Sequence, residues 1–465
     1  MTDSYFLPTS VPAEIFRAYD IRGIVDQQLT ESVVYGIGRA FATEALSVNQ
    51  KTIAVGRDGR LSGPSLSKAL MQGIRDAGAN VLNLGAVPTP LLYFATATGS
   101  TQTGIMLTGS HNPSNYNGLK MVLAGNTLSG SAIQGLKECL ERRDLAEGQG
   151  TLATFNIIPA YIAAITGDIA LKRPLKVVLD AGSGIAGAVA PELFRALGCE
   201  VIELFCEVDG HFPHHHPDPS QLKNLQHLIA CVQASKADVG LAFDGDGDRI
   251  GVVTDQGEVI WPDRQLMLYA ADVLSRHPGG KIIYDVKCTR LLAPWIAAHG
   301  GESLMWKTGH SFIKAKLKET QALLAGEMSG HTFFKERWYG FDDGLYTGVR
   351  LLEILATQSK PLGELFAQLP NAVSTSEITV AMNDETKFLF MQTFIKNCQF
   401  EGAVLNDLDG LRVEYPDAWG LVRPSNTSPC LVLRFEADTQ SRLDAIMADF
   451  KRELLTISDT LVIPF

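Results

Sequence analysis

Three short apolar runs, each ending in an aspartate, decide the fold of this chain: TIAVGRD (residues 52–58), LKVVLD (175–180) and KIIYD (281–285). Their length and their β-branched content predict buried strands. A helical stretch follows each run, and a glycine then leads into a second apolar run, at Gly78, Gly198 and Gly301. The order strand, helix, strand therefore occurs three times along the chain.

The third part of each repeat is another apolar run that stops in a polar loop containing glycine: GIMLTGSHNP (104–113), VGLAFDGDGDR (239–249) and ALLAGEMSGH (322–331). Strands that alternate with helices predict mostly parallel sheets, in which ligands bind beyond the carboxyl ends of the strands. Three repeats thus direct three loops at one cleft. The alternative is that the alternation is only that of any α/β chain, and the loops then have to carry the functional argument.

The pattern changes after about residue 370. Runs with strand character follow, EITVAM (377–382), GLRVEY (410–415), WGLVRP (419–424) and CLVLRFEA (430–437), and an amphipathic helix is expected over 441–455. This order predicts a small α+β domain, joined to the preceding part by LPNAV (369–373). A length of 465 residues agrees with three or four domains, because roughly 150 residues per domain is usual.

The charge balance limits the partners of the protein. Lysine and arginine number 40 and aspartate and glutamate 51, which gives a formal net charge of −11. Such a balance repels nucleic acid and anionic membranes over most of the surface, so we expect neither as a partner. An anionic small molecule has to meet locally clustered basic side chains.

The cysteines and the apolar stretches indicate the compartment. Seven cysteines are scattered and never form a CxxC pair, so neither a disulfide framework nor a zinc site is indicated. The first residues, MTDSYFLPTS, lack the basic and apolar regions of an export signal, and the most apolar stretch, 157–171, is interrupted by Asp168. These features predict a cytoplasmic protein without a transmembrane span.

The first polar loop, Thr108–Pro113, places Ser110 between a glycine and a histidine just past a strand, where its hydroxyl is a candidate nucleophile. The GxSxG pattern of a hydrolase is absent, because positions 108 and 112 are Thr and Asn. Alone, SHNP is also typical of a polar turn closed by Asn-Pro. Lys120, a few residues downstream, adds a cation suited to neutralising phosphate.

The second loop places Asp244, Asp246 and Asp248 on alternate residues, with glycines between them that let the three carboxylates reach one hard cation. An EF-hand is excluded, because its sixth and twelfth positions are Arg249 and Asp255 and a strand precedes the loop. The alternative is an acidic solvated turn, in which the three carboxylates would repel one another. The pattern therefore favours a magnesium site.

The two remaining loops are weaker signals by themselves. Glu327, Ser329 and His331 alternate, so that all three can face one side of an extended loop and hydrogen-bond to sugar hydroxyls. In the tail domain, Arg423–Thr427 offers a guanidinium beside hydroxyl, amide and backbone N–H groups, a combination that suits phosphate. Ordinary loop polarity and a Pro-Ser-Asn turn are the alternatives.

Taken in order, SHNP, DGDGDR, GEMSGH and RPSNTSP resemble the motifs of the α-D-phosphohexomutases, and more narrowly of the bacterial phosphomannomutase/phosphoglucomutase family. AYDIRG (18–23), GRD (56–58) and WKTGH (306–310) extend the resemblance over nearly the whole chain. The resemblance implies three similar α/β domains with mixed or parallel sheets and a smaller C-terminal α+β domain around a central cleft. We expect the boundaries 1–156, 157–258, 259–370 and 371–465.

The resemblance also implies an activity: the reversible conversion of hexose 1-phosphate and hexose 6-phosphate, for mannose and glucose. Ser110 would carry the transferred phosphoryl group, and glucose 1,6-bisphosphate or mannose 1,6-bisphosphate would be the intermediate. Mg²⁺ would be held by the phosphate on Ser110 and by Asp244, Asp246 and Asp248. No macromolecular partner is implied, and we expect a monomer.

The remaining roles implied by the resemblance concern charge and substrate contact. Three basic residues are expected to stabilise charge at the transferring group, namely Arg22, Lys120 and Arg249, with His111 and His331 as helpers. Glu327 and Ser329 are expected to contact sugar hydroxyls, and Tyr19, Lys287 and His310 to line the substrate path. Arg423, Ser425, Asn426 and Thr427 are expected to hold the phosphate that is not being transferred.

Several alternatives remain open from the sequence. TGSHNP and GEMSGH favour a mannose/glucose enzyme, whereas phosphoglucosamine mutases more typically show SASHNP and GEQSGH. An aspartyl-phosphate phosphatase with Asp244 as nucleophile would leave Ser110 and the Arg423 cluster without a role. A catalytically silent relative would need a degraded site, and none is visible. The His214–His216 run is interpreted as a structural loop, with metal binding as the alternative.

Overall fold

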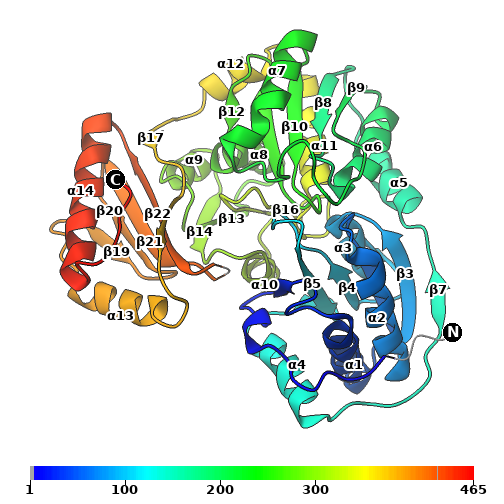
Figure 1. Cartoon of the computed structure of the whole chain (residues 1–465). Helices are drawn as coiled ribbons and strands as arrows, with labels where there is room; N and C mark the ends of the chain where they lie inside the picture. Colours follow the sequence, from blue (N-terminus) through cyan, green and yellow to red (C-terminus); the bar gives the residue numbers. More distant parts are fainter. Residues whose placement is uncertain (1–4, 427) are drawn as a thin grey trace.

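The computed structural model of the chain describes residues 5–426 and 428–465. Three α/β domains pack together, and the C-terminal domain, orange to red in Figure 1, lies at their left in that view. The observed fold thus belongs to the predicted class, with three related α/β domains and a different α+β domain.

The first sheet runs in the order β1-β5-β4-β2-β3-β7, with β6 beside β5. Its strands are β1 (Ile21–Ile24), β2 (Thr52–Arg57), β3 (Asn80–Ala86), β4 (Gly104–Leu107), β5 (Tyr116–Leu123), β6 (Asn126–Thr127) and β7 (Leu152–Thr154). The helices are α1 (Glu31–Ser47), α2 (Gly63–Asp76), α3 (Thr89–Thr98) and α4 (Ser131–Arg142), and a short 3₁₀ turn covers Ala13–Ile15. Thr30 caps the N-terminus of helix α1, because its side chain accepts a hydrogen bond from the Val33 N–H.

The second sheet runs in the order β12-β11-β10-β8-β9. Its strands are β8 (Lys176–Asp180), β9 (Glu200–Leu204), β10 (Val239–Phe243), β11 (Ile250–Thr254) and β12 (Val259–Ile260). The helices are α5 (Ile158–Asp168), α6 (Ala190–Ala196) and α7 (Gln226–Ser235), with 3₁₀ turns over Ile185–Ala188 and Leu222–Leu225.

The third sheet runs in the order β14-β13-β15-β16. Its strands are β13 (Lys281–Asp285), β14 (Glu302–Trp306), β15 (Leu324–Gly326) and β16 (Thr332–Phe334). The helices are α8 (Pro262–Arg276), α9 (Leu292–Ala298), α10 (His310–Thr320), α11 (Gly344–Thr357) and α12 (Leu362–Ala367).

The same strand arrangement occurs in all three α/β domains, which confirms the predicted repeat. A central strand (β2, β8 or β13) pairs in parallel with the next strand along the chain and with the one after that. That third strand (β4, β10 or β15) pairs antiparallel with the strand that follows it. The three polar loops connect these antiparallel pairs, so they all emerge at the carboxyl ends of parallel strands.

The C-terminal sheet is antiparallel, in the order β17-β22-β21-β20-β19, and β18 also pairs with β22. Its strands are β17 (Val373–Ser374), β18 (Ile378–Ala381), β19 (Val404–Asn406), β20 (Leu411–Glu414), β21 (Ala418–Pro424) and β22 (Cys430–Ala437). The helices are α13 (Lys387–Asn397) and α14 (Gln440–Ile457). Phe394, Phe435 and Phe450 form the centre of a separate apolar core between the helices and the sheet.

The three α/β domains share a larger core, to which helix α11 is central. Gly348 of α11 lies against Leu241, Ile250 and Phe194 of the second domain, and a Cβ at this position would approach each of them within 3.2 Å. Burying this helix against two domains fixes the second and third polar loops relative to each other.

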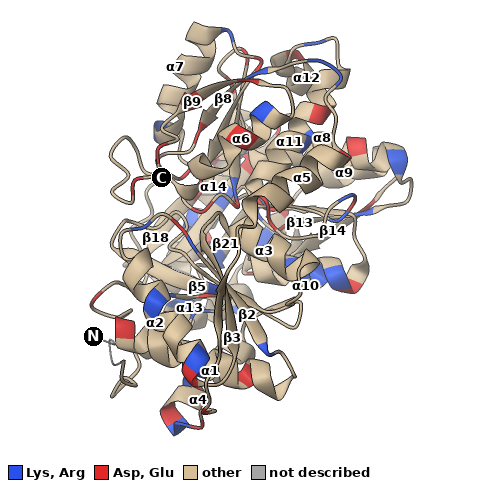
Figure 2. Ribbon diagram, turned by 90° about the vertical axis from the view of Figure 1, so that its right-hand side faces the viewer, with Lys and Arg blue, Asp and Glu red and all other residues tan. Residues whose placement is uncertain are grey.

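Basic and acidic residues are interspersed over the helices in Figure 2. Among the described residues, no helix combines the length and the apolar character that crossing a membrane requires.

Candidate active site

A cleft of about 810 Å³ opens between the four domains, and each domain contributes to its wall. The described residues of the predicted site that line it are Tyr19, Arg22, Ser110, His111, Lys120, Arg249, Lys287, His310, Glu327, Ser329, His331, Arg423, Ser425 and Asn426. Thr427 lies outside the described residues. Side chains that are up to about 400 residues apart in sequence therefore face one space.

Asp58, which directly follows β2, stabilises the loop after β4 through hydrogen bonds. One carboxylate oxygen of Asp58, Oδ2, accepts hydrogen bonds from the Thr108 hydroxyl (2.8 Å) and the Gly109 N–H (3.2 Å). The Thr108 hydroxyl in turn accepts the Ser110 N–H at 2.8 Å. Ser110 adopts a left-handed backbone conformation, with φ of 49°, and its side chain is almost fully buried. The loop therefore presents one hydroxyl in a fixed and strained position.

Arg60 completes the support of this loop, and the sequence analysis missed it. Its buried guanidinium donates to four backbone carbonyls of the loop and of the residues that follow it, Ser110 (2.8 Å), Asn112 (2.7 Å), Pro113 (2.6 Å) and Tyr116 (2.9 Å). Its Nε donates to Asp58 Oδ2 at 3.2 Å. A Cβ at Gly109 would lie 2.4 Å from this guanidinium, so only glycine fits there. The available signal was GRDGR (56–60), whose arginine follows β2 just as the serine loop follows β4.

The three histidines of the run 214–216 each contact a neighbouring part of the protein. His216 Nε2 hydrogen-bonds to the carbonyl of His111, and His215 Nε2 lies 3.1 Å from both carboxylate oxygens of Asp180. The His214 ring stacks on Phe205 at 4.0 Å. These contacts are those of a structural loop that packs against the serine loop.

The three aspartates lie beneath the floor of the cleft, each with no exposed surface. One ligand oxygen from each of Asp244, Asp246 and Asp248 lies within 4.8 Å of the others. The Ser110 hydroxyl donates to Asp244 Oδ2 at 3.0 Å, and the Thr89 hydroxyl, at the start of α3, donates to Asp246 Oδ2 at 2.6 Å. Burial, together with the charges of Asp246 and Asp248, raises the pKa of Asp244 well above its ordinary value.

Lys120 of β5 inserts between two of these carboxylates. Its ammonium donates to Asp246 Oδ2 at 2.8 Å and to Asp248 Oδ2. Burial lowers the pKa of Lys120, but Asp246 and Asp248 outweigh that effect and hold the pKa above its ordinary value. Lys120 is therefore a permanent cation in the wall of the same cleft that Ser110 lines.

The aspartate cluster fits a divalent metal ion. All of its donors are hard carboxylate oxygens, which Mg²⁺ prefers. Asp246 Oδ1 and Asp248 Oδ1 are buried and have no hydrogen-bond partner among the described residues. Asp246 Oδ1 thus has no described partner and Asp248 Oδ1 faces only the ring of His331, at 3.3 Å, which leaves carboxylate oxygens for a cation at this place.

His331 joins the second and third loops. Its Nδ1 lies 2.9 Å from Glu327 Oε2 and its Nε2 lies 3.3 Å from Asp248 Oδ1. Burial and the charge of Arg249 lower the pKa of His331, but the two carboxylates outweigh them and raise the pKa to about 9. Arg249 Nε also approaches His331 Nε2, at 3.1 Å. This second contact requires an unprotonated Nε2, whereas the two buried carboxylates that face the ring favour the protonated form.

Glu327 and Ser329 line the cleft but also serve the loop itself. Glu327 Oε1 accepts the Gly309 N–H at 2.6 Å, and the Ser329 hydroxyl lies 3.0 Å from His331 Nδ1. Burial raises the pKa of Glu327, but the hydrogen bond and charge of His331 outweigh it and keep the pKa below its ordinary value. The carboxylate remains charged and retains lone pairs for a sugar hydroxyl.

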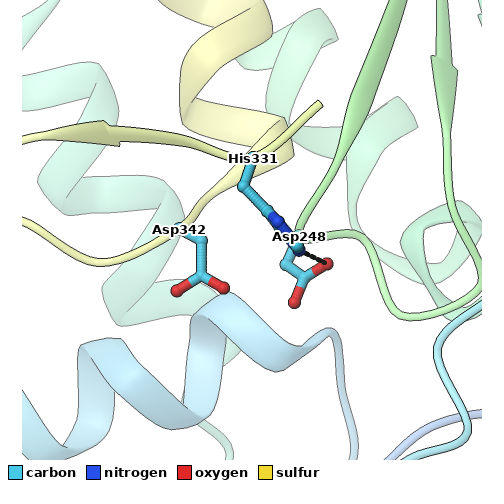
Figure 3. Close-up of side chains that lie close together, drawn as sticks. All are labelled: Asp248, His331 and Asp342. Atoms are coloured by element: carbon cyan, nitrogen blue, oxygen red, sulfur yellow. Dashed lines mark ion pairs between the residues drawn. The ribbon is translucent and has the colours of Figure 1, made fainter. Parts of the chain in front are cut away.

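A second group of possible ligands lies beside the aspartate cluster. Figure 3 shows Asp342 and His331 approaching Asp248 from the third domain, and one ligand atom from each lies within 4.8 Å of the others. Asp342 Oδ1 already accepts a hydrogen bond from Lys314 Nζ at 2.7 Å. This group offers two carboxylates and an imidazole, whereas the aspartate cluster offers three carboxylates, so the aspartate cluster fits a hard cation such as Mg²⁺ better.

The opposite wall carries the tail loop. The Arg423 guanidinium forms a two-point contact with Asp409, at 3.0 and 3.3 Å, and Asp409 Oδ2 also accepts the Thr308 N–H at 3.0 Å. Lys287 pairs with Glu377 at 2.5 Å. Sequence reasoning missed Asp409 and Glu377.

The ring of Tyr19 packs edge-on against His310 at 5.5 Å, at the junction of the first and third domains.

Family models match all four domains of the chain. Models of the phosphoglucomutase/phosphomannomutase α/β/α domains I, II and III match residues 13–147, 159–257 and 261–373, and the model of the C-terminal domain matches 377–453. The four matches occur in order and together cover most of the chain.

Relatives match the chain over nearly its full length. A protein named phosphomannomutase/phosphoglucomutase from Pseudomonas aeruginosa is 54% identical over 456 residues, which is 98% of each chain. A protein named phosphoglucomutase from Neisseria gonorrhoeae is 54% identical over 446 residues, 95% of this chain and 97% of the other.

A solved structure shares the fold. The crystal structure of a phosphoglucomutase/phosphomannomutase family protein from Burkholderia thailandensis superimposes with a TM-score of 0.94 at 52% sequence identity, and the match covers 98% of this chain and 100% of that one. Full-length identity above one half, the four domain matches and the shared fold confirm the resemblance seen in the loops: the chain belongs to the phosphoglucomutase/phosphomannomutase family of the α-D-phosphohexomutases.

Proposed function

We propose that this protein interconverts the 1-phosphates and 6-phosphates of mannose and glucose, with Ser110 as the carrier of the transferred phosphoryl group. One observation carries the proposal: the buried Ser110 hydroxyl, 3.0 Å from Asp244, faces a cleft whose other wall presents Arg423. A hexose with phosphate at one end can reach both. The names of the relatives from Pseudomonas and Neisseria support the same substrates.

The proposed reaction moves one phosphoryl group at a time. The O6 hydroxyl of a hexose 1-phosphate attacks the phosphorus on Ser110, the bond from phosphorus to the serine oxygen breaks, and the O6 proton passes to a base in the site. The product is a 1,6-bisphosphate. After the bisphosphate reorients, the serine oxygen attacks the phosphorus of the 1-phosphate, the bond from phosphorus to O1 breaks, and O1 takes back the proton from the base, which gives the hexose 6-phosphate and restores the phosphate on Ser110.

The residues around Ser110 supply charge for this transfer. Lys120 is held as a cation between Asp246 and Asp248, and Arg249 lies 3.9 Å from Asp244 on the same side. Arg22, paired with Asp20 at 2.5 Å, lines the same part of the cleft. These cations offset negative charge on the equatorial oxygens of the transferring group.

We assign the aspartates Asp244, Asp246 and Asp248 to Mg²⁺, together with the phosphate on Ser110. When bound, the ion would neutralise charge on the phosphoryl oxygens. Glu327 and Ser329 are assigned to sugar hydroxyls. Arg423, Ser425 and Asn426 are assigned to the phosphate that does not react, and Thr427 stays with them as a prediction from the sequence.

We infer that the protein works as a cytoplasmic monomer that takes only phosphosugars as partners. All seven cysteines are described, and all are free thiols, which agrees with a reducing compartment. The mass of the protein in solution, measured by light scattering, tests the monomer; a stable dimer would contradict it.

A coupled assay with mannose 1-phosphate, glucose 1-phosphate and glucosamine 1-phosphate, each with Mg²⁺ and a trace of bisphosphate, tests the function. We expect turnover of the first two substrates and little of the third. Preferred turnover of glucosamine 1-phosphate would instead favour a phosphoglucosamine mutase, and no turnover of any substrate would favour a silent relative.

The position of the covalent phosphate distinguishes a phosphoserine mechanism from an aspartyl-phosphate mechanism. Mass spectrometry of the purified protein should find acid-stable phosphate on Ser110. An acid-labile phosphate on Asp244 would support an aspartyl-phosphate phosphatase instead. Removal of metal with EDTA should abolish turnover and added Mg²⁺ should restore it, whereas full activity of verified metal-free protein would contradict the magnesium assignment.

A further inference from the structure

A second hollow, of about 330 Å³, lies between the first and third domains, away from the cleft. It is lined by α3, the turn around β6, α10 and the segment before α11. The residues on which the inference rests are Tyr93, Ser311, Lys314, Lys318, Lys335 and Tyr339. None of the described residues that line this hollow also lines the 810 Å³ cleft.

The charge of this hollow is opposite to that of the protein as a whole. Lys314, Lys318 and Lys335 line it, and no aspartate or glutamate is among its described lining residues. Figure 2 shows basic positions gathered on α10, which supplies two of these lysines. In a chain with a net charge of −11, such a local excess of cations favours an anion.

Two of the three ammonium groups have only neutral partners. Lys318 Nζ donates to the Asn126 side chain at 2.8 Å, and Lys335 Nζ donates to the Gln321 side chain at 2.9 Å. Neither forms an ion pair with a described carboxylate. A dianionic group that both ammonium groups contact would replace these two hydrogen bonds to neutral amides by ion pairs.

Two buried hydroxyls of the hollow are also without a partner. The Tyr93 OH and the Ser311 Oγ form no hydrogen bond with any described residue, although Tyr93 is only 3% and Ser311 only 1% exposed. Buried hydroxyls are normally satisfied, so these two residues leave hydrogen-bonding capacity unused in the wall of the hollow. This observation is independent of the lysines.

The apolar part of the hollow is aromatic. Tyr339, which is 48% exposed, stacks on Phe341 with ring planes 6° apart, and Phe341 packs against Tyr93. An exposed aromatic face beside cations fits a flat ring better than a flexible chain. The geometry points to a binding site for a small phosphate monoester carried on a flat ring.

The site is connected to the catalytic cluster. Lys314, whose ammonium lies 3.9 Å above the Tyr93 ring, pairs with Asp342, and Asp342 lies beside Asp248 and His331 in Figure 3. A phosphate that draws Lys314 away would leave Asp342 as a buried charge next to the proposed metal ligands. Lys314 therefore links the wall of the hollow to the acidic cluster beneath the cleft.

Isothermal titration of the full chain with phenyl phosphate tests the site. We expect Lys318→Gln/Lys335→Gln to weaken binding at least tenfold, because two charge-assisted contacts are lost. Lys316→Gln is the matched control: Lys316 lies on the same helix but pairs with Glu319 and does not line the hollow, so its affinity should equal that of the wild type. Both lysines have neutral partners, so the double variant should keep the fold, which circular dichroism checks.

Two further measurements separate this site from the cleft. Arg423→Gln should leave the affinity of the hollow unchanged, and crystals soaked in phenyl phosphate should show the ring against Tyr339 and the phosphate near Lys318 and Lys335. Binding that is lost in Arg423→Gln but kept in the double variant would overturn the inference, as would density in the cleft alone. Inorganic phosphate that binds as tightly as phenyl phosphate would overturn the aromatic part. None of these readouts depends on the proposed mutase activity.

Discussion

The serine loop and the tail loop, both assigned here to phosphate, are built in different ways. The backbone of the serine loop is fixed by side chains of its own domain, since Arg60 contacts four carbonyls and Asp58 accepts a hydroxyl and an N–H. The tail loop presents Arg423, whose guanidinium is held mainly by one carboxylate, Asp409. The tail loop has backbone contacts of its own, such as the Ser425 N–H with the carbonyl of Cys430 at 3.0 Å, but the guanidinium that it presents is oriented by one exchangeable ion pair.

This difference matches two tasks in the proposed reaction. A phosphoryl donor has to sit within a few tenths of an ångström of the attack line, so its loop must not move. The grip on the other phosphate has to accept C1 and C6 in turn, so its contacts must be replaceable. An ion pair between Arg423 and Asp409 keeps the guanidinium oriented until phosphate competes for it.

Ser110→Ala is expected to produce the largest effect, because it removes the group that the anchored loop exists to present. Turnover should fall by at least about a thousandfold, as is usual when a covalent nucleophile is lost. Substrate affinity should change little, because the tail loop is intact. The coupled assay and isothermal titration measure the two quantities.

Ser114→Ala, four residues further along the same loop and exposed, is the matched control and should retain full activity. Substantial turnover by dephosphorylated Ser110→Ala protein would contradict the phosphoserine mechanism and, with it, the contrast between the loops.

Arg60→Lys is expected to have the next largest effect. Lysine keeps the charge beside Asp58 but cannot reach four carbonyls, so Ser110 should shift. A displacement of about 1 Å can cost on the order of a hundredfold in rate, and we expect kcat to fall about tenfold to a hundredfold with KM nearly unchanged. Steady-state kinetics give both values.

Arg57→Lys is the control for Arg60→Lys, since the Arg57 guanidinium donates to the carbonyl of Asp58 and forms no hydrogen bond with any described residue of the serine loop. Circular dichroism should show both variants folded. A rise in KM equal to the fall in kcat would indicate that Arg60 acts on substrate binding rather than on the position of Ser110.

The difference between the loops also marks what the sequence can predict. The repeated strand order and the loops at 108–113, 244–249 and 327–331 were predicted, because apolar runs of strand length and chemically distinctive side chains are local signals. The predicted runs and the strands differ at their ends; for example, β8 begins at Lys176 and β2 ends at Arg57. Strand ends depend on hydrogen-bond partners, which are not local.

The supporting residues were not predicted, for a related reason. Arg60 and Asp409 have ordinary places in the sequence, in a loop after a strand and in a turn before another, and charged residues are common in both. Their importance comes from the groups that the fold brings to them, such as the carbonyl of Ser110 50 residues away. The ion pair of Lys314 with Asp342 is hidden in the same way.

Arg423→Gln tests the tail loop directly. The guanidinium contact is the same in the ground state and in the transition state of the reacting phosphate, so its loss should appear mainly in KM. We expect KM to rise about tenfold to a few hundredfold and kcat to fall less. The variant should also release more 1,6-bisphosphate, and isotope trapping measures that release. An unchanged KM together with unchanged release would mean that the non-reacting phosphate is held elsewhere.

Asp409→Asn is expected to have the smallest effect and the opposite sign. The amide can still accept the Thr308 N–H and a hydrogen bond from Arg423, so the loop should keep its shape, but the negative charge that competes with phosphate is gone. KM should therefore fall about twofold to fivefold, with kcat equal or slightly lower because the product phosphate is held longer. The effect should shrink as salt is added, since screening weakens the repulsion between Asp409 and phosphate. Asp407→Asn, two residues away in the same turn, is the control and should leave KM unchanged. A rise in KM would show that the charge of Asp409 is needed to orient Arg423, and the tail loop would then be as firmly anchored as the serine loop.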